Sequence, residues 1–357
     1  MRNFGSGLRA SFFAAGAMVS ISIVAASAQD LPVINFMSTN HESCSNYPQF
    51  VMQELGFLEE QGYQLNMLNT DTSVPYVAFL ANGAADVAVM GPGDILQALN
   101  ADQPIKVLYE THQAVTEYIV VTADSPIQRI QDLEGKVIGL ASDRDSIITA
   151  VALNAVGMTL DQVQTVVVGD AGPVLARALT EGTIDAFAGG TSDRSALMAA
   201  GLQLRNVTPP EAMSYVANTM VAWGPTLEEK RPMITAFLRA WAMSAHAGII
   251  EPTVVYQACQ KVIPEQWEQP GVGPAMINNS IFNTQIRRTV KFGELQQATW
   301  NAMQAPYIDV GEISAAFDVS TFLDTSFTDA VNSFTTDEVK AGIARFHEAN
   351  PNLLIPQ

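Results

Sequence analysis

Four short loops combine glycine, acidic and basic residues in a pattern that suits the binding of a small solute. They cover residues 39–47, 91–94, 142–146 and 189–193, and each joins a strand-like apolar segment to a helix-like one. Ligands of open parallel sheets bind beyond the carboxyl ends of the strands, where free helix amides attract anions. The candidate ligand-binding residues are therefore His41, Glu42, Tyr47, Gly91, Gly93, Asp94, Ser142, Arg144, Asp145, Ser146, Gly190, Thr191, Asp193 and Trp223.

The acids in these loops narrow the class of ligand. Asp94, Asp145 and Asp193 lie where helix N-caps are expected, and an N-cap carboxylate occupies the amides that an oxyanion would use. Arg144 and Arg194 could offset the negative charge. We therefore expect a neutral, zwitterionic or amine-bearing ligand rather than a bare sulfate or nitrate.

Several of these residues also have a plainer interpretation. The glycines at 91, 93, 189 and 190 either admit a ligand or merely form turns. The pair His41-Glu42 either faces a cleft or forms a solvated turn. Tyr47, Tyr118 and Trp223 could stack on a planar ligand or simply pack.

Motifs of catalysis, metal binding and nucleotide binding are missing from the sequence. It contains no G-x-S-x-G or H-E-x-x-H motif, no P-loop lysine after the run GPGD, and no C-x-x-C or His/Cys cluster. His112, His246 and His347 have no partners in sequence, so we read them as structural or surface residues. We predict a protein that is not an enzyme and that has neither a cofactor nor a metal site.

A long internal repeat predicts two similar lobes. Residues 80–91 (LANGAADVAVMG) and 179–190 (LTEGTIDAFAGG) share leucine, glycine and aspartate at one offset, including Asp86 and Asp185. The offset exceeds the roughly 20–50 residues of a solenoid unit, so the repeat indicates two half-domains. We expect Asp86 and Asp185 to help build the two lobes, and we expect the lobes to face one another across a cleft.

Alternating strand and helix patterns predict an α/β fold with mainly parallel sheets. Two strands near 117–122 and 216–222 would cross between the lobes and act as a hinge. The predicted lobes are 29–115 with 223–357, and 116–222. Strands are expected at 31–38, 63–68, 86–90, 105–109, 136–141, 165–168 and 184–188, and helices at 48–60, 75–82, 95–101, 146–156, 174–180 and 194–199. The remainder is a helical return with amphipathic patterns at 232–246, 252–262, 290–303 and 337–349.

The N-terminus and the net charge indicate an exported protein. Arg2 and Arg9 precede an apolar run that ends in Ala26-Ser27-Ala28, which predicts a signal peptide cleaved after Ala28. The alternative is an uncleaved anchor, and we expect no later segment to span a membrane. Loss of the two arginines changes the net charge from −18 to −20, which argues against binding of nucleic acid or anionic membranes. Cys44 and Cys259 could pair in an oxidising compartment, but sequence leaves their pairing open.

Four segments resemble a known family. They are residues 54–63 (ELGFLEEQGY), 80–91, 131–139 (QDLEGKVIG) and 317–327 (FDVSTFLDTSF), the last similar to a C-terminal D-x-S-x-x-x-D-x-S-F phrase. The chain thereby resembles the periplasmic solute-binding proteins of the nitrate/sulfonate/taurine and thiamine-precursor group. This resemblance implies a type II periplasmic-binding fold and a monomer that delivers its solute to an ABC transporter permease in the inner membrane.

Residues 142–146 depart from that family, since relatives often carry a Gly/Ser-rich stretch that suits oxyanions. Here the stretch is SDRDS, which argues against a simple sulfonate or nitrate ligand. Two other functions stay open. One is a periplasmic sensor or scaffold without transport. The other is an enzyme like the yeast-type pyrimidine synthase, which shares the fold but has a cysteine-rich motif that this sequence lacks.

Overall fold

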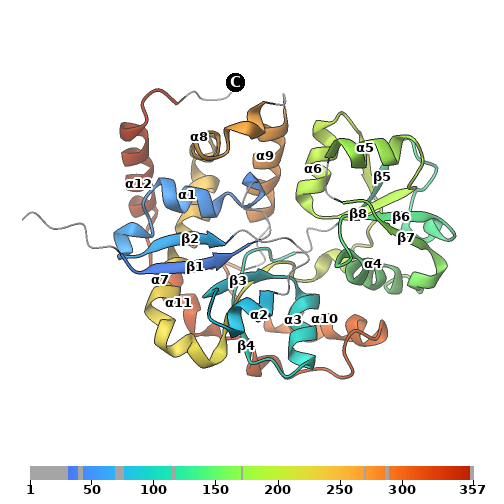
Figure 1. The fold of residues 1–357 in the computed structure, drawn as a ribbon, viewed down its shortest axis with the longest axis horizontal. Coiled ribbons are helices and arrows are strands. Elements are labelled where there is room, and N and C mark those ends of the chain that lie inside the picture. The colour runs from blue at the N-terminus through green and yellow to red at the C-terminus, as the bar shows by residue number, and fades with distance from the viewer. Residues whose placement is uncertain are drawn as a thin grey trace, which may run out of the picture. The chain divides into compact units, whose positions relative to one another are not determined.

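The computed structural model describes residues 31–38, 43–68, 76–114, 118–169, 172–268, 271–285 and 289–353 (Figure 1). Residues Pro32–Gln357 belong to one compact unit. The predicted signal peptide, its cleavage site, His41 and Glu42 lie outside the described residues.

The first lobe is built on a five-stranded sheet with the order β2-β1-β3-β10-β4. Strand β1 pairs in parallel with both of its neighbours, whereas β10 runs antiparallel to β3 and β4. The predicted boundary at residue 222 falls inside β10, which belongs to this sheet. The strands are β1 (Val33–Met37), β2 (Gln64–Leu68), β3 (Val87–Met90), β4 (Ile105–Glu110) and β10 (Thr219–Trp223).

The second lobe repeats this arrangement with the order β7-β6-β8-β5-β9. Strand β6 pairs in parallel with β7 and β8, and the crossing strand β5 is antiparallel to β8 and β9. Each sheet is thus mainly parallel with one antiparallel crossing strand, as the predicted two-strand connection requires. The strands are β5 (Tyr118–Thr122), β6 (Val137–Leu140), β7 (Gln164–Val167), β8 (Ala186–Gly189) and β9 (Leu204–Asn206), of which β9 was not predicted.

Asp86 and Asp185 occupy equivalent places in the two sheets, which confirms their predicted structural role. The Asp86 carboxylate accepts a hydrogen bond from the Asn35 amide at 2.7 Å, and the Asp185 carboxylate accepts one from the Val137 amide at 2.9 Å. The backbone amide of each aspartate donates to the carbonyl of the same partner, at 2.8 Å in both lobes. Each aspartate therefore fastens the start of its strand to the neighbouring strand.

Helices cover both faces of each sheet, as expected for buried strands with continuous apolar sequences (Figure 1). In the first sheet Phe36 packs with α7, whereas Met37 belongs to the cluster that contains α2, α3 and α10. In the second lobe α4 covers one face of the sheet, while α5 and α6 cover the other. The α-helices that precede the C-terminal return are α1 (Pro48–Glu54), α2 (Tyr76–Ala81), α3 (Pro92–Asn100), α4 (Asp145–Asn154), α5 (Gly172–Thr180) and α6 (Thr191–Ala199).

The C-terminal return is helical as predicted, but several helix bounds differ and the helices at Val272–Gln285 and Thr328–Val331 were not predicted. Helix α7 begins eight residues before Pro232, which lies inside it. The amphipathic pattern at 290–303 predicts a helix that starts before the observed one, because α10 begins only at Gln297. The helices are α7 (Gly224–Ile250), α8 (Pro252–Val262), α9 (Val272–Gln285), α10 (Gln297–Asp309), α11 (Thr328–Val331) and α12 (Thr336–Ala349).

Helix α7 corrects the expectation that no later segment is apolar enough to span a membrane. It has 27 residues, and by length and composition alone it qualifies. Its most apolar window is 67% buried inside the protein, where Phe237 and Trp241 pack on Phe36. The apolar composition of α7 therefore reflects its place in the core.

A disulfide joins the segment just before α1 to this helical return. Cys44 and Cys259 are both fully buried and bonded, with their Cα atoms 6.1 Å apart. The pairing that sequence left open is thus present. It ties the loop before α1 to α8.

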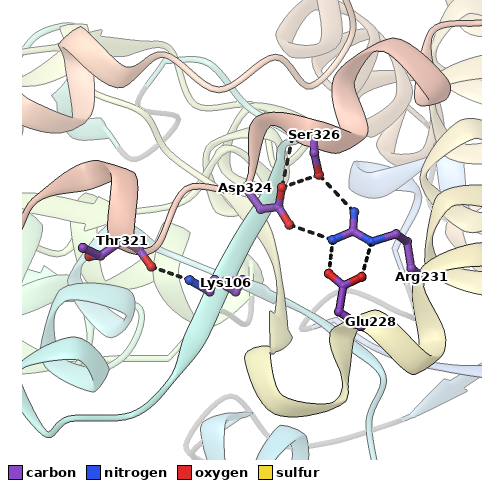
Figure 2. A network of polar contacts seen from close by, with 6 residues as sticks. All are labelled: Lys106, Glu228, Arg231, Thr321, Asp324 and Ser326. Atoms are coloured by element: carbon purple, nitrogen blue, oxygen red, sulfur yellow. Dashed lines mark hydrogen bonds and ion pairs between the residues drawn. The ribbon is translucent and has the colours of Figure 1, made fainter.

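The C-terminal phrase at 317–327 is a structural clamp (Figure 2). Asp324 accepts hydrogen bonds from the amide and hydroxyl of Ser326, and the Arg231 guanidinium contacts Asp324, Ser326 and Glu228. That guanidinium also lies 4.4 Å from the centre of the Phe327 ring. Backbone hydrogen bonds from Val107 to Phe322 and from Asp324 to Val107 attach the phrase to the free edge of β4. The clamp thus covers a sheet edge and fixes it to α7.

Candidate functional site

A cavity of about 60 Å³ lies beyond the carboxyl end of β3, between residues of the first lobe and residues of the second. Gly91, Gly93 and Asp94 come from the start of α3, and Arg144 and Asp145 come from the start of α4. The structure therefore brings together five of the predicted residues, three from the loop at 91–94 and two from the loop at 142–146. Further lining comes from Ile147, Ile148, Tyr215, Val216, Ala217 and Tyr307.

The start of α3 presents a carboxylate to this cavity. Gly91 is the N-cap residue with extended backbone, Pro92 occupies the first turn, and Asp94 follows in that turn. The Asp94 carboxylate lies 3.4 Å from the Arg144 guanidinium, with the two side chains 30% and 40% exposed. One ion pair thus connects the two lobes across the candidate site.

The start of α4 holds a second carboxylate in a different role. Asp145 accepts hydrogen bonds from the amide and the hydroxyl of Ser142, at 2.7 and 2.9 Å. Burial raises the pKa of the Asp145 carboxyl, and the hydrogen bonds from Ser142 oppose that rise. Asp145 and Asp94 were expected at N-cap positions, but the N-cap residues are Arg144 and Gly91. Each acid lies inside its helix, and Asp145 bonds back to the loop that precedes it.

Apolar contacts accompany the ion pair. Ile147 of α4 lies 3.5 Å from the position that a Cβ atom at Gly93 would occupy, and so does the Tyr307 ring. Val151 of α4 is fully buried and belongs to the core cluster of the first lobe. Gly93 therefore admits side chains of the protein, whereas the prediction allowed either a ligand or a turn.

The fourth predicted loop contributes to a different contact. Asp193 is buried and accepts a hydrogen bond from the Gly190 amide at 2.8 Å, so it caps the start of α6 from within the helix. Thr191 is the first residue of α6. Farther along this helix, Ser195 accepts a hydrogen bond from the Asn279 amide group of α9 at 2.6 Å. Helix α6 thus faces α9, and Gly190 and Asp193 do not line the 60 Å³ cavity.

Two aromatic residues and two serines of the predicted set do not line this cavity. Tyr47 is fully buried because its ring packs in the core of the first lobe. Its hydroxyl donates a hydrogen bond to the Ala245 carbonyl at 2.9 Å. Trp223 pairs with Ile105 at the amino end of β4. It therefore lies at the opposite end of the strands from Met90, which precedes the cavity. Ser142 bonds to Asp145, and the Ser146 hydroxyl donates to the Asp143 carbonyl. These four side chains are local or core contacts.

Two tyrosines of the cavity were not predicted. Tyr215 lies just before β10, and burial raises its pKa, with a smaller contribution from Glu211. Tyr307 comes from α10 and is 2% exposed. The position of Tyr215 beside a crossing strand was a usable signal, whereas nothing in the sequence places α10 near the start of α3.

A second, smaller cavity lies at the carboxyl end of β4, next to α9. Its volume is about 20 Å³, enough for roughly one water molecule. Buried Glu110 accepts hydrogen bonds there from the Gln296 amide and the Trp300 indole, at 2.7 and 3.1 Å. His112 also lines this cavity, and burial lowers its pKa to about 4. Among the described residues, no group of three His, Cys, Asp or Glu side chains is placed to hold a metal ion.

Comparison with known proteins gives both a family and a fold. A sequence profile of the family described as NMT1/THI5 like matches residues 45–254, more than half of the chain. No curated protein sequence matches.

Solved structures with the same fold share little sequence with this chain. The alkanesulfonate-binding protein SsuA from Xanthomonas axonopodis pv. citri, bound to MOPS, is 16% identical with a TM-score of 0.63, over 83% of this chain and 99% of that one. The periplasmic aliphatic sulphonate binding protein SsuA from Escherichia coli is 15% identical with a TM-score of 0.62, over 81% and 91%. The desulfurization enzyme DSZB is 17% identical with a TM-score of 0.59, over 87% and 99%. At these identities the likeness establishes the fold alone, the two-lobed architecture of periplasmic binding proteins.

Proposed function

The chain belongs to the NMT1/THI5-like family, and on this premise we propose that it is the solute-binding component of an ABC importer. The observation that carries the proposal is the meeting of Asp94 and Arg144, one from each lobe, at a shared cavity. Two solved proteins of the same fold are described as sulfonate-binding proteins. The proposed partner is an ABC transporter permease, and the proposed state in solution is a monomer.

The two lobes would capture the solute by moving about the crossing strands β5 and β10. These strands are the central connections, since each enters the sheet of its lobe between parallel strands. Motion of this kind needs backbone change at only a few residues where strands begin or end. The solute would then be enclosed between the starts of α3 and α4.

The proposed solute is a small organic molecule that is amine-bearing, heterocyclic or sulfonate-like. The cavity contains one guanidinium, two carboxylates and the two rings of Tyr215 and Tyr307. Charged groups next to apolar and aromatic walls are typical of sites that orient a small organic ligand.

We propose binding without catalysis, although an enzyme of the same fold exists. Both cysteines of the chain are joined in a buried disulfide, so neither provides a thiolate nucleophile. In the cavity, Asp94 pairs with Arg144 and Asp145 accepts hydrogen bonds from Ser142, so neither carboxylate is hydrogen-bonded to a serine or cysteine nucleophile of another loop among the described residues.

The proposed location is the periplasm. The N-terminal sequence has the features of a signal peptide, and disulfides persist in oxidising compartments. The Cys44–Cys259 bond supports this location, because a reducing cytoplasm would keep both thiols free.

A thermal-shift screen of the mature chain tests the proposal. The panel should include amino acids, aliphatic sulfonates, carboxylates, amines and nitrogen heterocycles, each at millimolar concentration. A solute that binds only the native state raises the melting temperature by mass action. We expect at least one solute to raise the melting temperature, and Arg144→Ala to remove the shift while leaving the solute-free melting temperature nearly unchanged. Failure of every solute to stabilise the protein would favour a scaffold.

A further inference from the structure

The ion pair between Asp94 and Arg144 bridges α3 and α4 where the solute is proposed to bind. We propose that the solute binds by replacing this ion pair, and that it therefore carries both an anionic and a cationic group. This inference rests on the proposed function and specifies the ligand of the same site.

The small size of the cavity favours a binding mode in which the ion pair separates. Its volume is about 60 Å³, whereas pockets for organic ligands measure roughly 300–1,000 Å³. A solute that fills a pocket of that size needs the start of α4 to move away from the start of α3, which separates Asp94 from Arg144.

The ion pair is weak enough to be exchanged. Its nearest charged atoms are 3.4 Å apart, and both side chains remain partly exposed. Solvent-exposed pairs of this kind have low net stability because water screens the attraction. By contrast, Asp145 accepts two hydrogen bonds from Ser142 and keeps that role in the loop. Asp94 and Arg144 are therefore the groups that become available to a solute.

Separation leaves two opposite charges without partners in a partly desolvated space. A zwitterion pairs its anionic group with Arg144 and its cationic group with Asp94. An anion alone would satisfy Arg144 but face the Asp94 carboxylate, and a cation alone would face the guanidinium. The site thus selects against singly charged solutes through repulsion as well as attraction.

The remaining walls restrict the part of the solute between its charges. Ile147, Tyr215 and Tyr307 supply apolar and aromatic surface at the cavity. A short aliphatic spacer fits such surface, and further charges would be buried without a partner.

Isothermal titration calorimetry with matched solutes tests the inference. Glycine, β-alanine, γ-aminobutyrate and taurine provide zwitterions with different spacings and anionic groups. Propionate, ethanesulfonate and n-propylamine provide the matching single charges. We expect at least one zwitterion to bind the wild-type protein at least 10-fold more tightly than its singly charged analogues.

Two variants that each remove one charge test the assignment of each charge. In Asp94→Asn the preference for a zwitterion over its matching anion should fall about 10- to 100-fold, the range for one hydrogen bond to a charged group. In Arg144→Gln the preference for a zwitterion over n-propylamine should fall by a similar factor. Arg177→Gln is the control. Arg177 of α5 pairs with Glu181 at the protein surface, so this variant should leave both preferences unchanged.

The outcomes separate this inference from the proposed function. Binding of anions, cations or neutral heterocycles as tightly as any zwitterion would overturn the inference and leave solute binding standing. A zwitterion preference that survives both Asp94→Asn and Arg144→Gln would overturn it as well. Failure of every solute, here and in the thermal-shift screen, would overturn the proposed function together with the inference.

Discussion

Asp86 and Asp185 are equivalent residues of two sheets, and each fastens its strand to the neighbouring strand by the same pair of hydrogen bonds. Their surroundings differ, however. Asp86 is 4% exposed and lies 2.5 Å from the Lys230 ammonium, whereas Asp185 is 35% exposed and lies 3.8 Å from Lys136. The repeat has kept one geometry in two electrostatic environments.

This difference predicts unequal costs for the same substitution. Asp86→Ala should lower the free energy of unfolding by about 3 kcal/mol, because it leaves Lys230 and the Asn35 amide without their buried acceptor. Asp185→Ala should lower it by about 1 kcal/mol, the loss of one hydrogen bond near solvent. Urea denaturation at neutral pH measures both, and equal losses would contradict the assigned difference in environment.

The disulfide predicts a large effect of reduction on stability. Cys44 and Cys259 are separated by 215 residues, so the bond restricts a long segment of the unfolded chain. By the chain-entropy argument it stabilises the protein by at most about 5 kcal/mol. The double variant Cys44→Ala/Cys259→Ala should unfold at markedly lower urea concentration, and dithiothreitol should affect only the wild-type protein. Identical curves for the variant and the untreated wild type would mean that the bond contributes nothing.

The C-terminal phrase contains its own matched control. Asp318 and Asp324 each accept hydrogen bonds from the serine two residues later, but only Asp324 also contacts Arg231. Hydrogen bonds from Ser326 and Arg231 hold the pKa of Asp324 below its usual range against the effect of burial. Asp324→Ala should cost about 2 kcal/mol of unfolding free energy, and Asp318→Ala should cost less. A larger loss for Asp318→Ala would show that the clamp does not depend on Arg231.

His112 predicts a loss of stability in acid. Its pKa is lowered to about 4 by burial, from 6.5 in an unfolded chain, so the unfolded state binds more protons between these values. The resulting stabilisation is present above pH 6.5 and disappears as the pH falls to 4, by about 3 kcal/mol at most. His112→Gln should therefore reduce the difference in unfolding free energy between pH 7 and pH 4.5. An unchanged difference would mean that His112 is already protonated in the native state at pH 4.5, so that burial does not lower its pKa.

The sequence predicted features that repeat or follow local patterns. The offset between Asp86 and Asp185 predicted two lobes, and apolar runs predicted all strands except the three-residue β9. Helix α8 has the predicted bounds because a proline begins it and its apolar face is regular. Pro232 misled the prediction of α7, since proline normally begins a helix, whereas here it lies within one.

Tertiary packing decided what sequence could not. Tyr47 and Trp223 follow the pattern of cleft aromatics, but only the folded chain shows that Tyr47 packs in the core and that Trp223 lies at the far edge of the sheet. Conversely, Tyr307 reaches the cavity from a helix more than two hundred residues after Asp94. The loops that end the repeated strands predicted where residues of a binding site would lie. That Asp94 and Arg144 face one another could be seen only in the structure.

The central claim is that a solute is held between Asp94 of one lobe and Arg144 of the other. Fluorescence energy transfer between labels on the two lobes tests this claim most directly. Val174 of α5 and Lys340 of α12 are exposed, and both native cysteines are bonded and buried, so Val174→Cys and Lys340→Cys can be labelled selectively. We predict that titration with a solute found by thermal shift changes the transfer efficiency with the midpoint measured by calorimetry. The same solute should cause no change in the labelled protein that also carries Arg144→Gln. Tight binding without a change in transfer, or a change that survives Arg144→Gln, would contradict the account.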